Sequence, residues 1–303
     1  MNKAIIAISL LWGVAAQAQV LNVTSVDRVT TPVDDKVVMQ AVAVSPQGDY
    51  LLLSTDTKQG LLKWDLATSA LTTLTDDAIA GNDVRINEDG SLVVYGSVSY
   101  KDKRRYEGLK AIDLNNNKKQ TLVKQTRNLQ GIAVENGSVA TVVDGNVKMH
   151  SIKKGASNAI TRPVLSRHHL KLYITRGGMT TQLAPNGIDE HYIWASLSPD
   201  GNRVLYYVSG YGAFVCDVDG NNVISMGNLT APKWWDNNTI VGMNEIDDEY
   251  CIIASSIVAR TLDGQEQVLT GDDVIATYPL PSNQSGKIAF STPDGKIYLI
   301  TVE

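Results

Sequence analysis

Residues Leu197–Tyr206 read LSPDGNRVLY, which is a strand end, a tight turn and a second strand. In such a turn, proline sets φ at the first position, Asp caps the turn through its side chain, and glycine accepts the positive φ that closes it. The pattern recurs as VSPQGDYLLL at Val44–Leu53 and as INEDGSLVVY at Ile86–Tyr95, and weaker copies start at Trp234 and Pro281. The chain is therefore a series of repeated antiparallel strand pairs.

A second hairpin follows each of these pairs, which gives four antiparallel strands in a unit of about forty residues. Its copies lie at 62–75, 109–123, 147–162, 171–184, 213–226, 252–269 and from residue 296 onward. Continuous apolar runs such as Tyr50–Leu53 are typical of sheets that are buried on both faces. A radial stack of such units is a β-propeller, so we expect an all-β fold made of four-stranded antiparallel blades.

The repeats predict either six or seven blades. The second hairpin occurs seven times, but the first occurs only six times, because residues 163–170 are too few for two full strands before Leu172. Either one blade is degenerate and lacks a strand, or the third blade carries an insertion. The last unit ends after its third strand. We therefore expect a strand within Leu21–Thr30 to supply the fourth and to close the ring, which removes open sheet edges.

The turn at 198–201, the strand after it and the segment FVCDVDG at Phe214–Gly220 resemble the WD40-like (PD40) repeat of the TolB propeller. The same repeat occurs in the propellers attached to prolyl-oligopeptidase-type hydrolases. The best copies lie at 40–76 and 191–228, and fair copies lie at 83–124 and 275–303. The resemblance implies a β-propeller but no single function, because such repeats occur in binding proteins, peptidase accessory domains and polysaccharide lyases.

The chain has 303 residues and a net charge of −5, which gives no general field for nucleic acid. Its first residues contain Lys3, an apolar run and a small-x-small cleavage site that ends at Ala18, the three parts of a secretory signal peptide. We expect residues 1–19 to be this signal and residues 20–303 to form a single domain. No later stretch is apolar enough to span a bilayer, so we expect an exported protein of the periplasm or cell surface.

Motifs for catalysis and for metal binding are not found in the sequence. The chain has no Gly-x-Ser-x-Gly, no His-Glu-x-x-His and no Cys-x-x-Cys. His168 and His169 are adjacent in a segment expected to be extended, so their side chains should point to opposite faces and not chelate one metal ion. Cys216 and Cys251 fall in predicted strands and are either free thiols or, in an exported protein, a disulfide. We expect no catalytic residue, no metal site and no cofactor.

Propellers of this kind bind ligands where the loops after the second and fourth strands surround the central channel. Here these loops carry both charge signs and exposed aromatic residues, whereas the Pro-Asp-Gly turns at the other end cap themselves. The expected ligand-binding residues are Arg104, Arg105, His191, Tyr211, Asp247, Asp248 and Glu249. The three acidic residues also raise the hypothesis of a Ca²⁺ site, without the spacing of an EF-hand.

The function that fits best is that of an exported, monomeric, non-enzymatic propeller. Its partner would be a protein, peptide or glycan of the cell envelope, bound at one face of the channel. The alternative is a propeller-type polysaccharide lyase or hydrolase, with His191 as base and the loop arginines beside a substrate carboxylate. Lyase sites of this kind usually need a metal and clustered histidines, so metal analysis of the purified protein would separate the two hypotheses.

Overall fold

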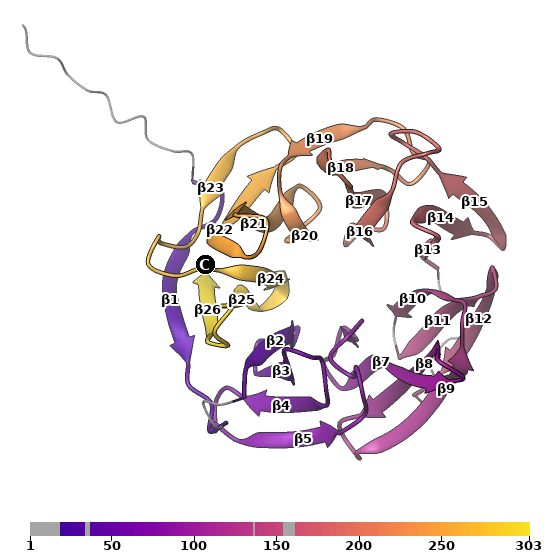
Figure 1. Ribbon diagram of the computed structural model, residues 1–303, viewed down its shortest axis with the longest axis horizontal. Coiled ribbons are helices and arrows are strands. Elements are labelled where there is room, and N and C mark those ends of the chain that lie inside the picture. Colours follow the sequence, from indigo (N-terminus) through magenta and orange to yellow (C-terminus); the bar gives the residue numbers. More distant parts are fainter. Residues whose placement is uncertain (1–18, 34–36, 136, 154–160) are drawn as a thin grey trace, which may run out of the picture.

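The computed structural model describes residues 19–33, 37–135, 137–153 and 161–303. Seven antiparallel sheets stand around a central axis like the blades of a propeller (Figure 1). The predicted all-β propeller is confirmed, and the number of blades is seven. Apart from Gln19, the expected signal peptide at 1–19 lies outside the described residues. No helix within the described ranges is long and apolar enough to cross a membrane.

Five of the sheets have four strands and two have three. Blade 1 consists of β2 (Met39–Val44), β3 (Tyr50–Thr55), β4 (Leu61–Asp65) and β5 (Leu71–Thr75). Blade 2 consists of β6 (Arg85–Ile86), β7 (Leu92–Lys101), β8 (Arg104–Asp113) and β9 (Lys118–Thr126). Blade 5 consists of β16 (Tyr192–Leu197), β17 (Arg203–Val208), β18 (Gly212–Asp217) and β19 (Ile224–Gly227). Blade 6 consists of β20 (Thr230–Trp234), β21 (Thr239–Asp247), β22 (Ile252–Thr261) and β23 (Glu266–Val268).

Blade 7 closes the ring with strands from both ends of the described chain. It contains β24 (Thr277–Ser282), the 3-10 helix η1 (Asn283–Ser285), β25 (Lys287–Ser291), β26 (Ile297–Val302) and β1 (Val23–Val29). β1 pairs antiparallel with β26, from Val23 opposite Val302 to Val29 opposite Ile297. The prediction that residues 21–30 supply the missing fourth strand is confirmed.

The hydrophobic core lies between the blades, because the side chains of each sheet alternate between its two neighbours. In β3, Leu51 and Leu53 pack toward blade 7 in a cluster with Ala289, while Leu52 packs toward blade 2 in a cluster with Val93. All three leucines are fully buried, and each contributes about 1.5–3 kcal/mol to folding. The continuous apolar runs of the sequence therefore do mark sheets that are covered on both faces.

The antiparallel order of the strands gives the ring two different faces. Turns after the first and third strands of a complete blade lie together, and we call this side the turn face. Connections after the second and fourth strands lie at the opposite end, which we call the loop face.

Blades 3 and 4 depart from this pattern, with three strands each among the described residues. Blade 3 contains β10 (Leu129–Glu135), β11 (Ser138–Val143) and β12 (Asn146–Ser151), and blade 4 contains β13 (Val164–His168), β14 (Lys171–Arg176) and β15 (Met179–Leu183). β13 starts on the turn face, where Pro163 lies beside Gly201 of the β16–β17 turn. It ends on the loop face, where the carbonyl of Leu170 accepts the N–H of Tyr192 at 2.8 Å.

Among the described residues blade 4 therefore lacks a first strand, and its three strands correspond to the second, third and fourth of a complete blade. This is one of the two alternatives that the shortness of residues 163–170 left open. Because the strand is skipped, β13 runs from the turn face to the loop face, opposite to the first strands of the complete blades. The β13–β14 turn consequently lies on the loop face instead of the turn face.

The seam between blades 3 and 4 is thinly packed. Its core holds three described buried residues, Ala140, Val142 and Val164, whereas the core between blades 6 and 7 holds thirteen. β10 and β13 approach each other closely at Gly131, where a Cβ would lie 2.7 Å from the carbonyl oxygen of Leu165. Glycine at this position lets the two backbones meet where few side chains fill the space.

On the turn face, polar side chains are engaged by their own turns. Ser198, which is buried, accepts the N–H of Arg203 at 2.9 Å, and Asp200 accepts a second backbone N–H from the same turn. Ser45 and Asn87 occupy the same buried capping position in blades 1 and 2. The sequence assigned capping to the Asp or Asn inside the turn, but the residue that starts the turn provides the buried cap.

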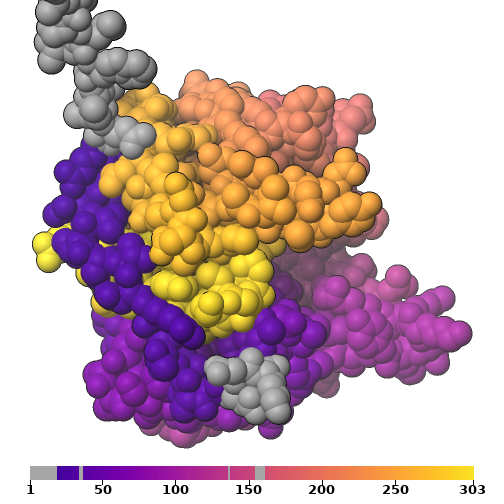
Figure 2. All heavy atoms as spheres, turned by 60° about the vertical axis from the view of Figure 1, so that its left-hand side comes forward, coloured from indigo at the N-terminus to yellow at the C-terminus, as the bar shows by residue number. Residues whose placement is uncertain are grey.

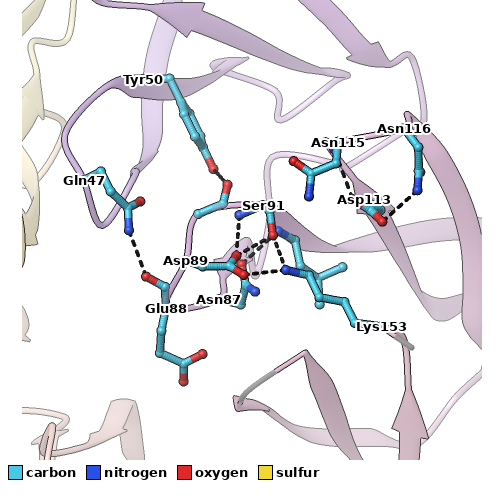
Figure 3. A network of polar contacts seen from close by, with 12 residues as sticks. Gln47, Tyr50, Asn87, Glu88, Asp89, Ser91, Asp113, Asn115, Asn116 and Lys153 are labelled. Carbon is cyan, nitrogen blue, oxygen red and sulfur yellow. Dashed lines mark hydrogen bonds and ion pairs between the residues drawn. The ribbon is translucent and has the colours of Figure 1, made fainter. Parts of the chain in front are cut away.

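Contacts between turns also join neighbouring blades (Figure 3). The Tyr50 hydroxyl donates to the carbonyl of Gly90 at 2.6 Å, which links blade 1 to blade 2. Lys153, just after β12, pairs with Asp89 at 2.5 Å and donates to Ser91, which links blade 3 to blade 2. Burial acts to raise the pKa of Asp89, but donation by Lys153 and Ser91 outweighs it and holds that pKa well below its usual range.

Deleting residues 21–30 should lower the thermal midpoint by roughly 10 °C or more, because the deletion leaves the outer edge of β26 unpaired and removes the buried Leu21. Differential scanning calorimetry measures this directly. Arg28→Ala, which keeps the strand and changes one exposed side chain, is the matched control and should leave the midpoint unchanged. An unchanged midpoint in the deletion would contradict closure by β1.

Lys153→Met should lower the midpoint slightly, by about 1–2 °C at pH 7, because the Asp89 side chain is 61% exposed and such ion pairs contribute little. Asp89 titrates at lower pH when folded than when unfolded. Its contribution is therefore present above about pH 4 and is lost as the pH falls below that value. The difference between wild type and variant should shrink between pH 4 and pH 2. Lys148→Met, on β12, should show no such pH-dependent difference.

Candidate functional site

Two long hairpins project from the loop face. β7 and β8 extend to a turn at Asp102–Lys103, and β21 and β22 extend to a turn at 248–251. Figure 2 shows them as a purple-to-magenta projection and an orange projection on the same side of the ring. The first hairpin is basic at its tip and the second is acidic, so the loop face offers two surfaces of opposite charge.

The basic hairpin borders an open hollow of about 420 Å³, lined by Lys103, Arg104, Arg105, Glu107 and Arg127. Arg105 pairs with Glu107 at 3.0 Å, and the other three cations have no ion-pair partner among the described residues. Lys103, Arg104 and Arg105 come from the β7–β8 hairpin, while Arg127 lies in the crossing from β9 to β10. Four cations and one carboxylate thus surround the hollow.

A second open hollow, of about 300 Å³, adjoins the first at Arg127. Its lining consists of Arg127, Asn128, Leu129 and Gln130 from the β9–β10 crossing, and Arg167, His168, His169 and Leu170 from the β13–β14 turn. Asn128 and Gln130 are held in place by bonds to Asp144 and to the N–H of Gly145. The hollow lies over the thinly packed seam between blades 3 and 4, and it exists because β13 ends on the loop face.

The β13–β14 turn has an unfavourable sequence for its backbone. His169 and Leu170 have φ of 48° and 61°, which is the left-handed conformation of a two-residue type I′ turn. Such turns favour Asn-Gly, and a non-glycine residue there costs about 1–2 kcal/mol. The turn also stacks the His168 and His169 rings, with centroids 3.9 Å apart. The sequence-based expectation that the two rings point to opposite faces was wrong, because His169 is not extended.

The acidic hairpin is self-capped at its tip. Asp247 accepts the N–H of Glu249 at 3.0 Å, and Asp248 accepts those of Tyr250 and Cys251 at 3.1 and 2.9 Å. These backbone bonds hold the pKa of Asp248 below its usual value. The described residues contain no group of three or more His, Cys, Asp or Glu that could hold a metal ion. The Ca²⁺ hypothesis for this hairpin stays a prediction.

The structure brings two of the seven expected binding residues into one place. Arg104 and Arg105 line the first hollow. His191, just before β16, and Tyr211, 68% exposed in the β17–β18 turn, lie on the loop face but line neither hollow. Asp247, Asp248 and Glu249 form the separate tip on blade 6.

Sequence reasoning missed Arg127, Arg167, His168 and His169 as members of the site. Arg127 is a single cation in a short crossing, and the sequence gives it no signal. The other three could have been found from the shortness of residues 163–170, because a skipped strand moves the next turn to the loop face.

Two further cations lie close enough for the charge of one to act on the other. Lys233 belongs to β20 and Arg85 to β6, the first strands of blades 6 and 2. Burial, together with the weaker effect of the Arg85 charge, lowers the pKa of Lys233 to about 8 against the opposing effect of Asp83. The loop-face acid Asp77 is neutralised in contrast, because it pairs with Lys110 at 2.8 Å and accepts the Tyr95 hydroxyl.

No cysteine or tryptophan lines either hollow. Cys216 and Cys251 are both free thiols. Cys216 is buried, and burial raises its pKa to about 12. Cys251 is exposed in the turn after β21, not in a strand. Trp235 is buried in the core between blades 6 and 7, and Trp234 packs partly buried against the core between blades 5 and 6.

Comparison with known proteins supports the fold alone. Neither a family model nor a curated protein matches the chain. A chain of the "Crystal Structure of Mitotic Checkpoint Complex" is similar with a TM-score of 0.58 and 11% identity, covering 98% of each chain. "The structure of putative TolB from Agrobacterium tumefaciens" has a TM-score of 0.53 and 17% identity, covering 88% of this chain and 91% of that one. The expected likeness to TolB therefore holds for the propeller fold.

An oligogalacturonate lyase from Vibrio parahaemolyticus is also similar, with a TM-score of 0.47 and 11% identity over 95% of this chain and 99% of that one. At this score the likeness adds nothing to the choice between a binding protein and an enzyme.

Replacing His169-Leu170 with Asn-Gly should raise the thermal midpoint by about 3 °C or more, because Asn and Gly adopt the left-handed conformation with less strain. Gly177→Asn is the matched control, since the Gly177–Gly178 turn of the same blade has open space around it and no strained residue. It should move the midpoint far less. A lower midpoint in the His169-Leu170 variant would show that these side chains make stabilising contacts, and the strain argument would fail.

Proposed function

We propose that the protein is an exported, non-enzymatic β-propeller that binds a protein, peptide or glycan of the cell envelope on its loop face. The observation that supports this most is the concentration of unpaired cations around the two hollows. The chain as a whole carries a net charge of −5, yet Lys103, Arg104, Arg127 and Arg167 have no described ion-pair partner.

The turn face offers fewer unpaired polar side chains to a partner than the loop face does. Asp65 accepts the backbone N–H groups of Ala67 and Thr68, and Asp113 accepts that of Asn115. These side chains are therefore occupied by their own turns, as the sequence predicted. A partner that approached the turn face would meet carboxylates that already accept hydrogen bonds, whereas the cations of the loop face are free to pair.

The alternative of a lyase or hydrolase gains no support from the arrangement of residues. It needs a base beside the cations that would hold a substrate carboxylate. His191, the candidate base, lines neither of the two hollows, and the histidines that do line one are stacked on each other in a turn. Binding without chemistry accounts for the same residues and needs no base.

Site-specific photocrosslinking in the native host tests which face binds. A crosslinker at the exposed loop-face residues Tyr211 or Tyr100 should capture an envelope partner, because these side chains lie on the proposed face without contributing its charge. The matched control is a crosslinker at Asp219, exposed on the turn face, which should capture none. Crosslinks from Asp219 but not from the loop face would show that the wrong face has been chosen.

The charged residues are tested by substitution in the same assay. Arg104→Ala with Arg105→Ala should weaken capture by about tenfold while the thermal midpoint stays within about 2 °C, because both side chains are exposed. Lys118→Ala with Lys119→Ala removes the same charge from the opposite end of blade 2 and should leave capture unchanged. Turnover of a polyuronate by the purified wild-type protein would instead favour the enzyme.

A further inference from the structure

The two hollows form one basic groove across blades 2, 3 and 4. They share Arg127, and their linings run from the β7–β8 turn through the β9–β10 crossing to the β13–β14 turn. We call this the basic groove and define it by Lys103, Arg104, Arg105, Arg127, Arg167, His168 and His169. Three elements that are distant in the sequence thus contribute to one continuous surface.

The charge of the basic groove selects an anion. Five of its residues are permanent cations, and Glu107, the one acidic residue that lines it, is already paired with Arg105. Four of the five cations are arginines, whose planar guanidinium groups bind carboxylates and phosphates through two parallel hydrogen bonds. Arginines held near one another without carboxylates repel each other, so an anion that bridges them gains binding energy.

The shape of the basic groove favours an extended chain over a small molecule. Both hollows are open and shallow, with volumes of about 300 and 420 Å³, and each is large enough for one or two side chains. A small ligand bound tightly is usually enclosed in a mostly apolar pocket. Here a ligand would lie across the surface and reach both hollows, with Arg127 between them.

The lining also argues for a peptide over a glycan. Neither hollow is lined by Trp, Tyr or Phe. The four tryptophans of the described chain are taken up by packing: Trp64 and Trp235 are buried, and Trp194 and Trp234 pack against the core clusters. The basic groove thus offers no Trp, Tyr or Phe ring on which a sugar could stack, and most of its lining residues make hydrogen bonds or carry charge.

We propose that the basic groove binds an extended acidic segment of a polypeptide, with one carboxylate side chain at Arg104 and Arg127 and another at Arg127 and Arg167. This inference rests on the proposed function, of which it names the partner class. Arg167 lies near the end of β13 on the loop face, directly before the strained turn that stacks His168 and His169.

Fluorescence anisotropy with a labelled oligo-glutamate peptide of ten residues tests the proposal on the full mature chain. Wild-type protein should bind this probe, and the affinity should fall as the salt concentration rises. Arg127→Ala with Arg167→Ala should weaken binding by at least about tenfold, since each arginine makes charge-assisted hydrogen bonds. Arg127→Lys with Arg167→Lys keeps the charge and should still weaken binding several-fold, because lysine cannot form the paired bonds.

Lys118→Ala with Lys119→Ala is the matched control and should bind the peptide as wild type does. Two results would overturn the proposal: oligo-glutamate binding that is unchanged in the Arg127/Arg167 variants, or an oligogalacturonate of equal charge that binds through the same arginines more tightly. The thermal midpoint of each variant shows whether it is folded.

Failure of this inference can be distinguished from failure of the proposed function. If the Arg127/Arg167 variant still crosslinks its envelope partner from Tyr211, the loop face binds but the basic groove does not take an acidic peptide. If Tyr211 and Tyr100 capture nothing in the wild-type protein, the proposed function itself fails.

Discussion

Every complete blade of this protein is a sheet whose two faces are both apolar, and that constraint fixes the rest of the fold. A sheet of this kind cannot be stable with water on one side, because fully buried side chains such as Leu51 and Leu52 pack in opposite directions. Stacking blades in a row would leave two apolar faces exposed at the ends. Closing the row into a ring covers them all, and β1 completes the last blade.

The core between two blades is smallest, among the described residues, where blade 4 has only three strands, and the candidate site lies there. In the part of the chain that the structure describes, blade 4 has no first strand, so the core between blades 3 and 4 is small and β10 approaches β13 closely at Gly131. The same omission reverses β13 and brings its turn to the loop face. The missing strand therefore explains both the small core between blades 3 and 4 and the reversed direction of β13. Together these two features leave a hollow lined by Arg127 and Arg167.

The sequence allowed the blade type, the closure of the ring and the two faces to be predicted, because turn chemistry and apolar runs are local signals. Arg104 and Arg105 could be predicted as well, since they stand in a long hairpin. Arg127 could not, because its proximity to Arg167 depends on how two incomplete blades pack. The acidic tip looked free in sequence, but Asp247 and Asp248 are bound to their own backbone.

The arrangement of charge on the loop face lowers the stability of the fold. The two faces differ in how far their polar and charged groups are paired. On the turn face, polar groups are matched: Asp89 has Lys153, and Ser198 and Asp200 cap their own turn. On the loop face, arginines from three elements lie around one groove with a single carboxylate between them, and a neighbouring turn places His169 and Leu170 in a conformation that favours glycine. Strain and unpaired like charges in the same place oppose folding. A ligand with two or more carboxylates would remove the repulsion between the arginines, so the bound state relieves the penalty that the free protein carries.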